Sequence, residues 1–153
     1  MSISNTLFRF ALAFSFFSFS FALLAEPTLE EVVVSARKVD ESVQDVPIAM
    51  SVFTSSDISD AGIERPEDFI ALTPNVVMAN TVNVGDTLVT IRGLTSTRDA
   101  ESNFAFVVDG VLQTNPNAFN RELLDIAQIE VLKGPQGALY GRNATSGAIL
   151  ITT

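Results

Sequence analysis

The side chains that could carry chemistry in this sequence are carboxylates, because its 153 residues include no histidine and no cysteine. Those absences exclude Ser-His-Asp and Cys-His catalysis and zinc sites built from His or Cys. Asp109, Asp125 and Glu130 are the carboxylates that could pair for acid-base work. Asp109 has a sufficient role in a turn, and we expect the other two to face solvent or a basic partner. We therefore predict no catalytic residue, and a carboxylate-only hydrolase is the least favoured function.

Two further patterns resemble ligand sites without completing them. Four glycines space a loop between two apolar runs, as in a nucleotide site: Gly134, Gly137, Gly141 and Gly147. A phosphate loop ends in Gly-Lys-Ser/Thr, however, whereas Gly141 is followed by Arg142 and Asn143. Asp57 and Asp60 offer half of a cation site, but the spaced oxygen ligands of a calcium loop are missing. We expect the glycines to adopt positive φ or to allow close packing, and we predict no metal site.

A valine triplet, Val32–Val34, stands alone in a polar stretch, with acidic residues before it and basic residues after it. We call residues 31–36 the valine segment. One interpretation, slightly favoured by composition, is an edge strand of the domain that follows. The other is a short linear motif that adds as a strand to the sheet edge of another protein.

The first 25 residues have the order of a secretory signal peptide, with one cation, Arg9, before an apolar run. Cleavage after Ala25 or Ala22 is possible, so we expect an exported chain. The sequence carries 9 basic and 18 acidic residues, a net charge of −9. Nucleic acid and anionic lipid are therefore poor partners. We expect residues 26–45 to form a tether and residues 46–153 to form one domain.

Alternating apolar residues predict the strands of this domain. They fall at residues 48–53, 87–92, 129–133 and 148–152, and a hairpin covers residues 104–113. Asp109 and Gly110 in that hairpin are the strongest short-range signal for a two-residue type I′ turn.

Three short helices are predicted between these strands. Ser55 or Ser56 caps the first helix, which ends at Gly62. The second helix begins at Pro66 and ends at Leu72, before Pro74. The third covers residues 121–127, with Asn120 as its cap.

The remaining stretches are predicted to be loops, at residues 74–86, 94–103 and 114–120. The order of the elements predicts an α+β (mixed α/β) domain, in which short helices pack against a small mixed β-sheet. The elements are too short and too few to form a membrane barrel.

Three separate segments of the chain coincide with one known family. Residues 30–36, "EEVVVSA", look like the TonB box of outer-membrane TonB-dependent receptors. "TIRGL" and "FVVDGV" resemble the central strands of the plug domain of these receptors. Residues 126–153, "IAQIEVLKGPQGALYGRNATSGAILITT", are similar to the C-terminal signature of the plug. The matched positions are Gly93, Asp109, Gly110, Glu130, Gly134, Pro135, Tyr140, Gly141 and Gly147.

The resemblance implies a plug inside a twenty-two-stranded outer-membrane barrel, which moves when TonB, energised by the inner-membrane proton gradient, pulls the box. The implied ligand is a scarce nutrient: a ferric siderophore, cobalamin, haem or an oligosaccharide. No cofactor is implied. The residues that the C-terminal domain of TonB would bind are Glu31, Val32, Val33, Val34, Ser35 and Ala36.

The resemblance also suggests contacts with the barrel and the ligand. In plugs of this family buried arginines pair with carboxylates of the barrel, and Arg92 and Arg142 stand on the matching motif positions. Residues 93–103 and 113–120 match the apical loops that touch ligand. The candidate ligand residues in these loops are Thr97, Arg98, Asn115 and Asn117.

The chain departs from the family at its C-terminus, where it ends with the plug and the β-barrel is absent. We therefore expect a fragment, a truncated product or a free-standing plug. A full receptor would lie in the cell outer membrane, and a free-standing plug would lie in the periplasm. The alternative function is a soluble periplasmic binding or signalling domain that works without a barrel.

Overall fold

The computed structural model of the chain describes residues 31–80, 87–97 and 100–153. The expected signal peptide, residues 1–25, and the first residues of the expected tether, 26–30, lie outside the described residues. Residues 31–153 form one compact unit. Among the described residues, no helix combines the length and the apolar character needed to cross a membrane.

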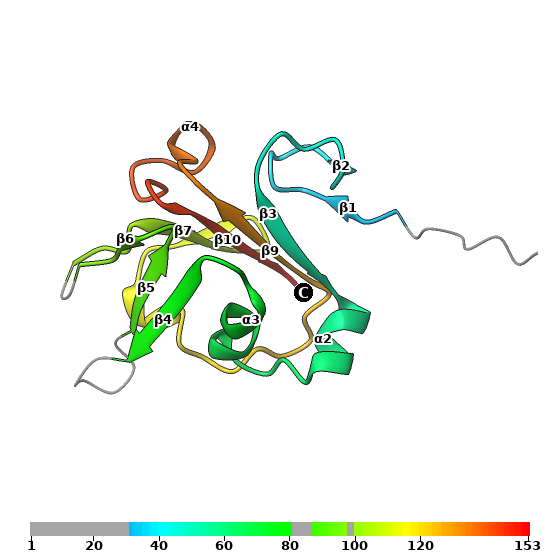
Figure 1. The fold of residues 1–153 in the computed structure, drawn as a ribbon, viewed down its shortest axis with the longest axis horizontal. Helices are drawn as coiled ribbons and strands as arrows, with labels where there is room; N and C mark the ends of the chain where they lie inside the picture. The colour runs from blue at the N-terminus through cyan, green and yellow to red at the C-terminus, as the bar shows by residue number, and fades with distance from the viewer. Residues whose placement is uncertain (1–30, 81–86, 98–99) are drawn as a thin grey trace, which may run out of the picture. The chain divides into compact units, whose positions relative to one another are not determined.

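The main sheet has five strands in the order β3-β9-β10-β7-β8. Figure 1 labels β3, β9, β10 and β7 of this sheet. Its strands are β3 (Met50–Thr54), β7 (Phe104–Val108), β8 (Val111–Gln113), β9 (Gln128–Lys133) and β10 (Gly147–Thr152). The β10–β7 pair is parallel, and the other three pairs are antiparallel. The mixed sheet confirms the predicted fold class, and each of these strands falls where the apolar alternation predicts one.

A second sheet consists of β4 (Val76–Asn80), β5 (Thr87–Ile91) and β6 (Leu94–Thr95), all antiparallel. The loop predicted for residues 74–86 is therefore wrong over residues 76–80, and residues 81–86 lie outside the described part of the chain. The loop predicted for residues 94–103 is wrong over residues 94–95, which form β6. Val76 is 5% exposed whereas Val77 is 62% exposed, so β4 has one buried face and one exposed face. The flanking asparagines and threonines conceal this alternation in the sequence.

Two short helices, α2 (Ser55–Ala61) and α3 (Pro66–Leu72), follow β3. The bounds of α3 confirm the prediction from its prolines. The cap of α2 is Thr54, however, and not Ser55 or Ser56. Thr54 Oγ1 accepts a hydrogen bond from the Asp57 N–H, and the Asp57 carboxylate accepts one from the Thr54 N–H at 2.9 Å. This reciprocal pair is a capping box.

The capping box predicts that Thr54→Ala lowers the free energy of unfolding by about 1 kcal/mol. The alanine leaves the Asp57 N–H without its side-chain acceptor. Urea denaturation of the purified chain measures the difference. Ser59→Ala, on the exposed side of the same helix, is the matched control and should change the free energy by less than about 0.5 kcal/mol. Equal stabilities of the two variants would contradict the capping role.

The β7–β8 hairpin turns at Asp109 and Gly110, whose φ angles are 47° and 78°. Both are positive, as a type I′ turn requires, and the predicted hairpin is confirmed. The Asp109 carboxylate also accepts hydrogen bonds from the Thr153 N–H and Oγ1, both at 2.9 Å. These bonds hold the pKa of Asp109 below its usual value. The turn is therefore tied to the end of β10.

The segment between β8 and β9 differs from the prediction. A 3-10 helix, η1 (Pro116–Ala118), lies in the predicted loop, and residues 121–127 do not form the predicted helix. The Leu123 N–H donates to the Glu64 carbonyl at 2.8 Å, and the Ala127 N–H donates to the Thr152 carbonyl at 2.8 Å. The Ala127 N–H is an amide that the predicted helix would have bonded to the Leu123 carbonyl, so its bond to Thr152 replaces a helical bond.

The larger hydrophobic core lies between the two sheets and α3. Four phenylalanines meet in it, and Phe119 contacts three of them edge-on or nearly so: Phe69, Phe104 and Phe106. A smaller core covers the other face of the main sheet, with Leu132, Leu150 and Tyr140 among its members. Successive residues of β9 and β10 contribute to the two cores in turn, because side chains of a strand alternate between its faces.

Candidate functional site

The valine segment folds back onto the domain. Its residues Val33 and Val34 form β1, which pairs antiparallel with β2 (Glu41–Ser42) in a separate two-stranded sheet. Val34 is 1% exposed and Ala36 is fully buried, whereas Val33 is 50% exposed. Val34 and Ala36, in the stretch expected to be a tether, therefore pack against the domain, and β1 is not an edge strand of the main sheet.

Glu130 of β9 holds the centre of the valine segment. The Ser35 N–H donates to Glu130 Oε1 at 3.0 Å. Glu130 is only 2% exposed, so the expectation that it faces solvent or a basic partner is wrong. Its Oε2 atom has no hydrogen-bond partner among the described residues. Burial raises the pKa of Glu130 above its usual value, and the hydrogen bonds from Ser35 oppose that shift.

Two more side chains bind the backbone of the segment on either side of Ser35. Gln128 Nε2 donates to the Val33 carbonyl at 3.0 Å, and the Tyr140 hydroxyl donates to the Ala36 carbonyl at 2.7 Å. Lys38 Nζ lies 5.6 Å from the centre of the Tyr140 ring. Burial raises the pKa of Tyr140 to about 12, so its hydroxyl keeps its proton at neutral pH. We call Gln128, Glu130 and Tyr140 the backbone clamp.

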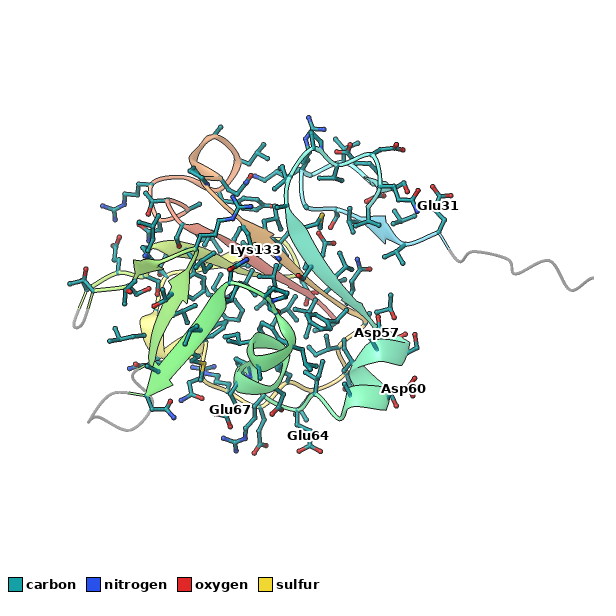
Figure 2. The ribbon with its side chains drawn as sticks, viewed as in Figure 1. Glu31, Asp57, Asp60, Glu64, Glu67 and Lys133 are labelled. Atoms are coloured by element: carbon teal, nitrogen blue, oxygen red, sulfur yellow. The ribbon has the colours of Figure 1, made fainter. Side chains whose placement is uncertain are left out.

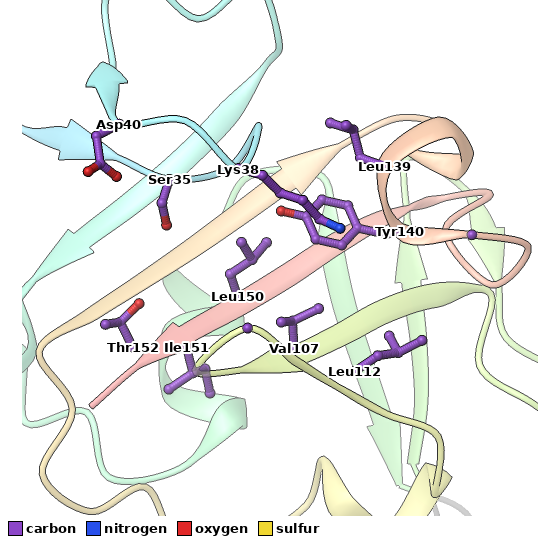
Figure 3. Close-up of a pocket in the computed structure, with 12 residues that line it drawn as sticks. Ser35, Lys38, Asp40, Val107, Leu112, Leu139, Tyr140, Leu150, Ile151 and Thr152 are labelled. Carbon is purple, nitrogen blue, oxygen red and sulfur yellow. The ribbon is translucent and has the colours of Figure 1, made fainter.

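Beside the clamp lies a pocket of about 460 Å³, between residues 35–40 and the main sheet (Figure 3). Lys38, Asp40 and Tyr140 are among its polar residues, and Val107 and Leu150 belong to its apolar wall. Sequence patterns alone did not reveal this pocket, because its two walls come from distant parts of the chain.

The three candidate acid-base carboxylates have separate structural environments. Asp109 lies in the hairpin turn, Asp125 is exposed, and Glu130 belongs to the clamp. Asp57 and Asp60 lie on α2, at the surface (Figure 2). Within the described ranges no group of three or more Asp, Glu, His or Cys residues is placed to hold a metal ion.

Both candidate lock arginines are exposed. Arg92 follows β5 with a φ angle of 51°, and its Nη1 lies 3.1 Å from the point that a Cβ on Gly134 would occupy. Arg142 forms an ion pair with Glu101 at 2.8 Å. That pair is at the surface, where such pairs contribute little stability. The guanidinium groups are therefore accessible to a further partner.

The glycines of the C-terminal loop have three different roles. Gly134 and Gly141 have positive φ angles, as expected. Gly147 allows close packing, because a Cβ there would collide with the Leu132 carbonyl oxygen. Gly137 instead begins a short helix, α4 (Gly137–Tyr140), which the sequence did not predict. This helix carries Tyr140 into the clamp.

The other signature and loop positions lie at the surface. Gly93 and Pro135 are exposed, as is Thr97. Asn115 caps η1, since its side chain accepts a hydrogen bond from the Asn117 N–H at 3.0 Å. The remaining candidate, Arg98, lies outside the described residues.

The sequence signals and this geometry agree with a family model described as the TonB-dependent Receptor Plug Domain, which matches residues 42–148. The chain therefore belongs to the plug-domain family of TonB-dependent receptors, as the resemblance of its motifs implied.

Similar proteins include the pesticin receptor of Yersinia enterocolitica, 31% identical over 129 residues, which cover 84% of this chain and 19% of that receptor. The vitamin B12 transporter BtuB of Vibrio vulnificus is 30% identical over 132 residues, 82% of this chain and 21% of that protein. Among solved structures, the ferric yersiniabactin uptake receptor FyuA of Yersinia pestis matches 69% of this chain and 17% of its own, with 31% identity and a TM-score of 0.64. The chain thus spans about a fifth of the length of these relatives.

Proposed function

We propose that this chain is the plug of an energy-coupled outer-membrane receptor that takes up a scarce nutrient. The match to the plug family carries the proposal, together with the extended valine segment at the N-terminal side of the domain. In this reading, the C-terminal domain of TonB binds residues 31–36 by strand addition, and force then rearranges the plug. The work is transport, not catalysis. The names of the relatives include a ferric yersiniabactin uptake receptor and a vitamin B12 transporter, which supports a nutrient ligand of that kind.

The proposal assigns parts of the chain to different places. Residues 1–25 are a signal peptide, residues 26–45 hold the TonB box, and residues 46–153 fill the lumen of a twenty-two-stranded barrel in the outer membrane. Arg92 and Arg142 would pair with carboxylates of that barrel, and their exposure in this structure supports the assignment. The ligand would touch the loops that carry Thr97, Arg98, Asn115 and Asn117.

The proposal predicts that Val33→Pro weakens binding of the TonB C-terminal domain at least about tenfold, because proline has no N–H to give to an added strand. Titration of the purified chain with that domain measures the affinity. Val33→Thr is the matched control, since it keeps the N–H and the β-branched shape. Circular dichroism should show both variants folded. Undiminished binding by folded Val33→Pro would count against the assignment of the box.

A second candidate is a soluble periplasmic binding or signalling domain that works without a barrel. The pocket of about 460 Å³ favours it, because residues of this chain alone line the pocket. Blots of outer-membrane and periplasmic fractions with an antibody against residues 40–153 distinguish the two functions by the size and location of the band. A heavy band in the outer membrane supports the receptor. A periplasmic band near the size of this chain supports the free-standing domain.

A further inference from the structure

The main sheet carries a row of apolar side chains that crosses three neighbouring strands. Leu150 of β10 is paired with Val107 of β7, and Val107 is paired with Leu112 of β8. Paired residues of neighbouring strands point to the same face of a sheet, so these three side chains lie next to one another. We call Leu112, Val107 and Leu150 the apolar row.

The pocket of about 460 Å³ lies against this row, and all three members of the row line it (Figure 3). Leu150 and Val107 are buried, whereas Leu112, on the edge strand β8, is 41% exposed. Sites that hold small molecules have volumes of about 300–1,000 Å³ and combine an apolar wall with a few polar groups. The pocket therefore has the size and the apolar wall of a small-molecule site.

The ammonium group of Lys38 gives the pocket a positive charge. Lys38 is the only basic residue among the described residues that line the pocket. Its φ angle is 60°, which is uncommon for a residue with a Cβ, and its N–H donates to the Ser35 carbonyl at 2.8 Å. Strained backbone of this kind is concentrated at functional sites. The turn holds Lys38 Nζ 5.6 Å from the centre of the Tyr140 ring.

The surroundings of Lys38 favour an anion over a cation. Within the described part of the chain Lys38 forms no ion pair, so its charge is not cancelled. The face of an aromatic ring is a favourable place for a cationic ligand, but Lys38 already lies over Tyr140. Asp40 is the one acidic residue among the described residues that line the pocket, and Figure 3 shows Ser35 between it and Lys38.

We propose that this pocket binds a small amphipathic carboxylate, whose head group pairs with Lys38 and whose aliphatic tail lies on the apolar row. The head group accepts a charge-assisted hydrogen bond from Lys38 Nζ, and burial of the tail removes apolar surface from water. The chain has a net charge of −9 and repels anions at long range, so recognition of the head group depends on Lys38. The proposal is independent of the proposed function, because neither TonB nor a barrel takes part in it.

Calorimetric titration of the purified chain with three ligands tests the recognition of the head group. The ligands are octanoate, octanol and octylammonium, which share one tail and differ in charge. We expect octanoate to bind at least about tenfold more tightly than the other two, because only its head group pairs with an ammonium. Added salt should narrow this difference, since it screens the pair at the mouth of an open pocket.

Substitutions separate the head-group site from the tail site. Lys38→Gln should weaken octanoate about tenfold and leave octanol unchanged, and Lys38→Arg should restore octanoate. Lys133→Gln removes a positive charge outside the pocket and is the matched control for charge. Leu112→Thr should weaken octanoate and octanol alike, by about fourfold, as expected for about one buried methylene. Val77→Thr, at an exposed position of the second sheet, is its control and should change neither.

Circular dichroism should show every variant folded. The proposal would be overturned if octanoate did not bind, if octanol bound as tightly, or if Lys38→Gln and Lys133→Gln had equal effects. Tightest binding by octylammonium would also overturn it and would assign the head-group site to Asp40. Dimerisation of the chain that Leu112→Thr abolishes, without binding of octanoate, would assign the apolar row to a contact between two copies. These failures are distinct from a failure of the proposed function, which Val33→Pro and the TonB domain test.

Discussion

Phe119→Ala is expected to lower the free energy of unfolding by about 4 kcal/mol, the largest effect of any single substitution considered for this protein. Phe119 is 3% exposed, and its ring centre lies 5.0 Å from that of Phe106, 5.2 Å from that of Phe104 and 6.3 Å from that of Phe69. Edge-on contacts of this kind add to the gain from burial. The alanine would leave a cavity that three rigid rings cannot fill.

The free energy of unfolding falls for a second reason, because Phe119 anchors the long connection between β8 and β9. Residues 114–127 contain only one turn of 3-10 helix, so few local bonds hold them in place. Phe119 fixes this stretch to β7 and α3, and through it the start of β9. A domain of this size is stable by about 5–15 kcal/mol, so the substitution would remove a large fraction of that stability.

Chemical denaturation followed by circular dichroism measures this prediction. Leu124→Ala is the matched control, since Leu124 belongs to the same stretch but is 73% exposed, and it should change the free energy by less than about 0.5 kcal/mol. Phe119→Leu should fall between the two, because it keeps part of the apolar volume. A loss below about 1 kcal/mol in Phe119→Ala would show that the ring cluster does not hold the core.

Gly147→Ala is expected to lower the free energy of unfolding by about 3 kcal/mol, through crowding and not through a cavity. Gly147 begins β10 and is paired with Lys133 of β9 and Phe104 of β7, so its backbone is held on both sides. A methyl group there would collide with the Leu132 carbonyl oxygen and lie 3.2 Å from Ile91 Cδ1. A carbonyl inside a sheet has little freedom to move, so the central strands would have to separate.

Gly137→Ala provides the control in the same loop. A Cβ at Gly137 would meet no atom within 4 Å, and Gly137 is not among the residues with positive φ. Alanine also suits the helix α4 better than glycine does, so this variant should be as stable as the parent or slightly more stable. Similar thermal midpoints for the two variants would contradict the close approach at Gly147.

Sequence patterns correctly predicted the elements that are defined by neighbouring residues, either through short-range hydrogen bonds or through the alternation of apolar side chains. Asp109 and Gly110 fix their turn by themselves, since both readily adopt positive φ. Pro66 and Pro74 delimit α3 in the same local manner, because proline favours the first position of a helix and cannot continue one. Residues 121–127 have a helical pattern, but their amides bond to Glu64 and Thr152, and tertiary contacts outweigh a weak local preference.

Some features of the candidate site could also be predicted from local sequence patterns, and others depended on tertiary contacts. The order of the motifs indicated the plug family, and the family model matches residues 42–148. The role of Glu130 was missed, since a charged residue inside a strand usually faces solvent. The signal available beforehand was Leu132, two residues further on and on the same face of β9, because an apolar side chain there indicates that this face is covered as well.

The sequence by itself determined the family, the fold class, the hairpin turn and most of the strands, because periodicity and turn chemistry act over a few residues. It also determined that Glu130 lies on the opposite face of β9 from Ile129 and Val131, since side chains alternate along a strand. Only the tertiary structure decided what covers that face. The covering segment is 95 residues away in the chain, and its bond to Glu130 depends on the packing of both cores, which no local pattern encodes.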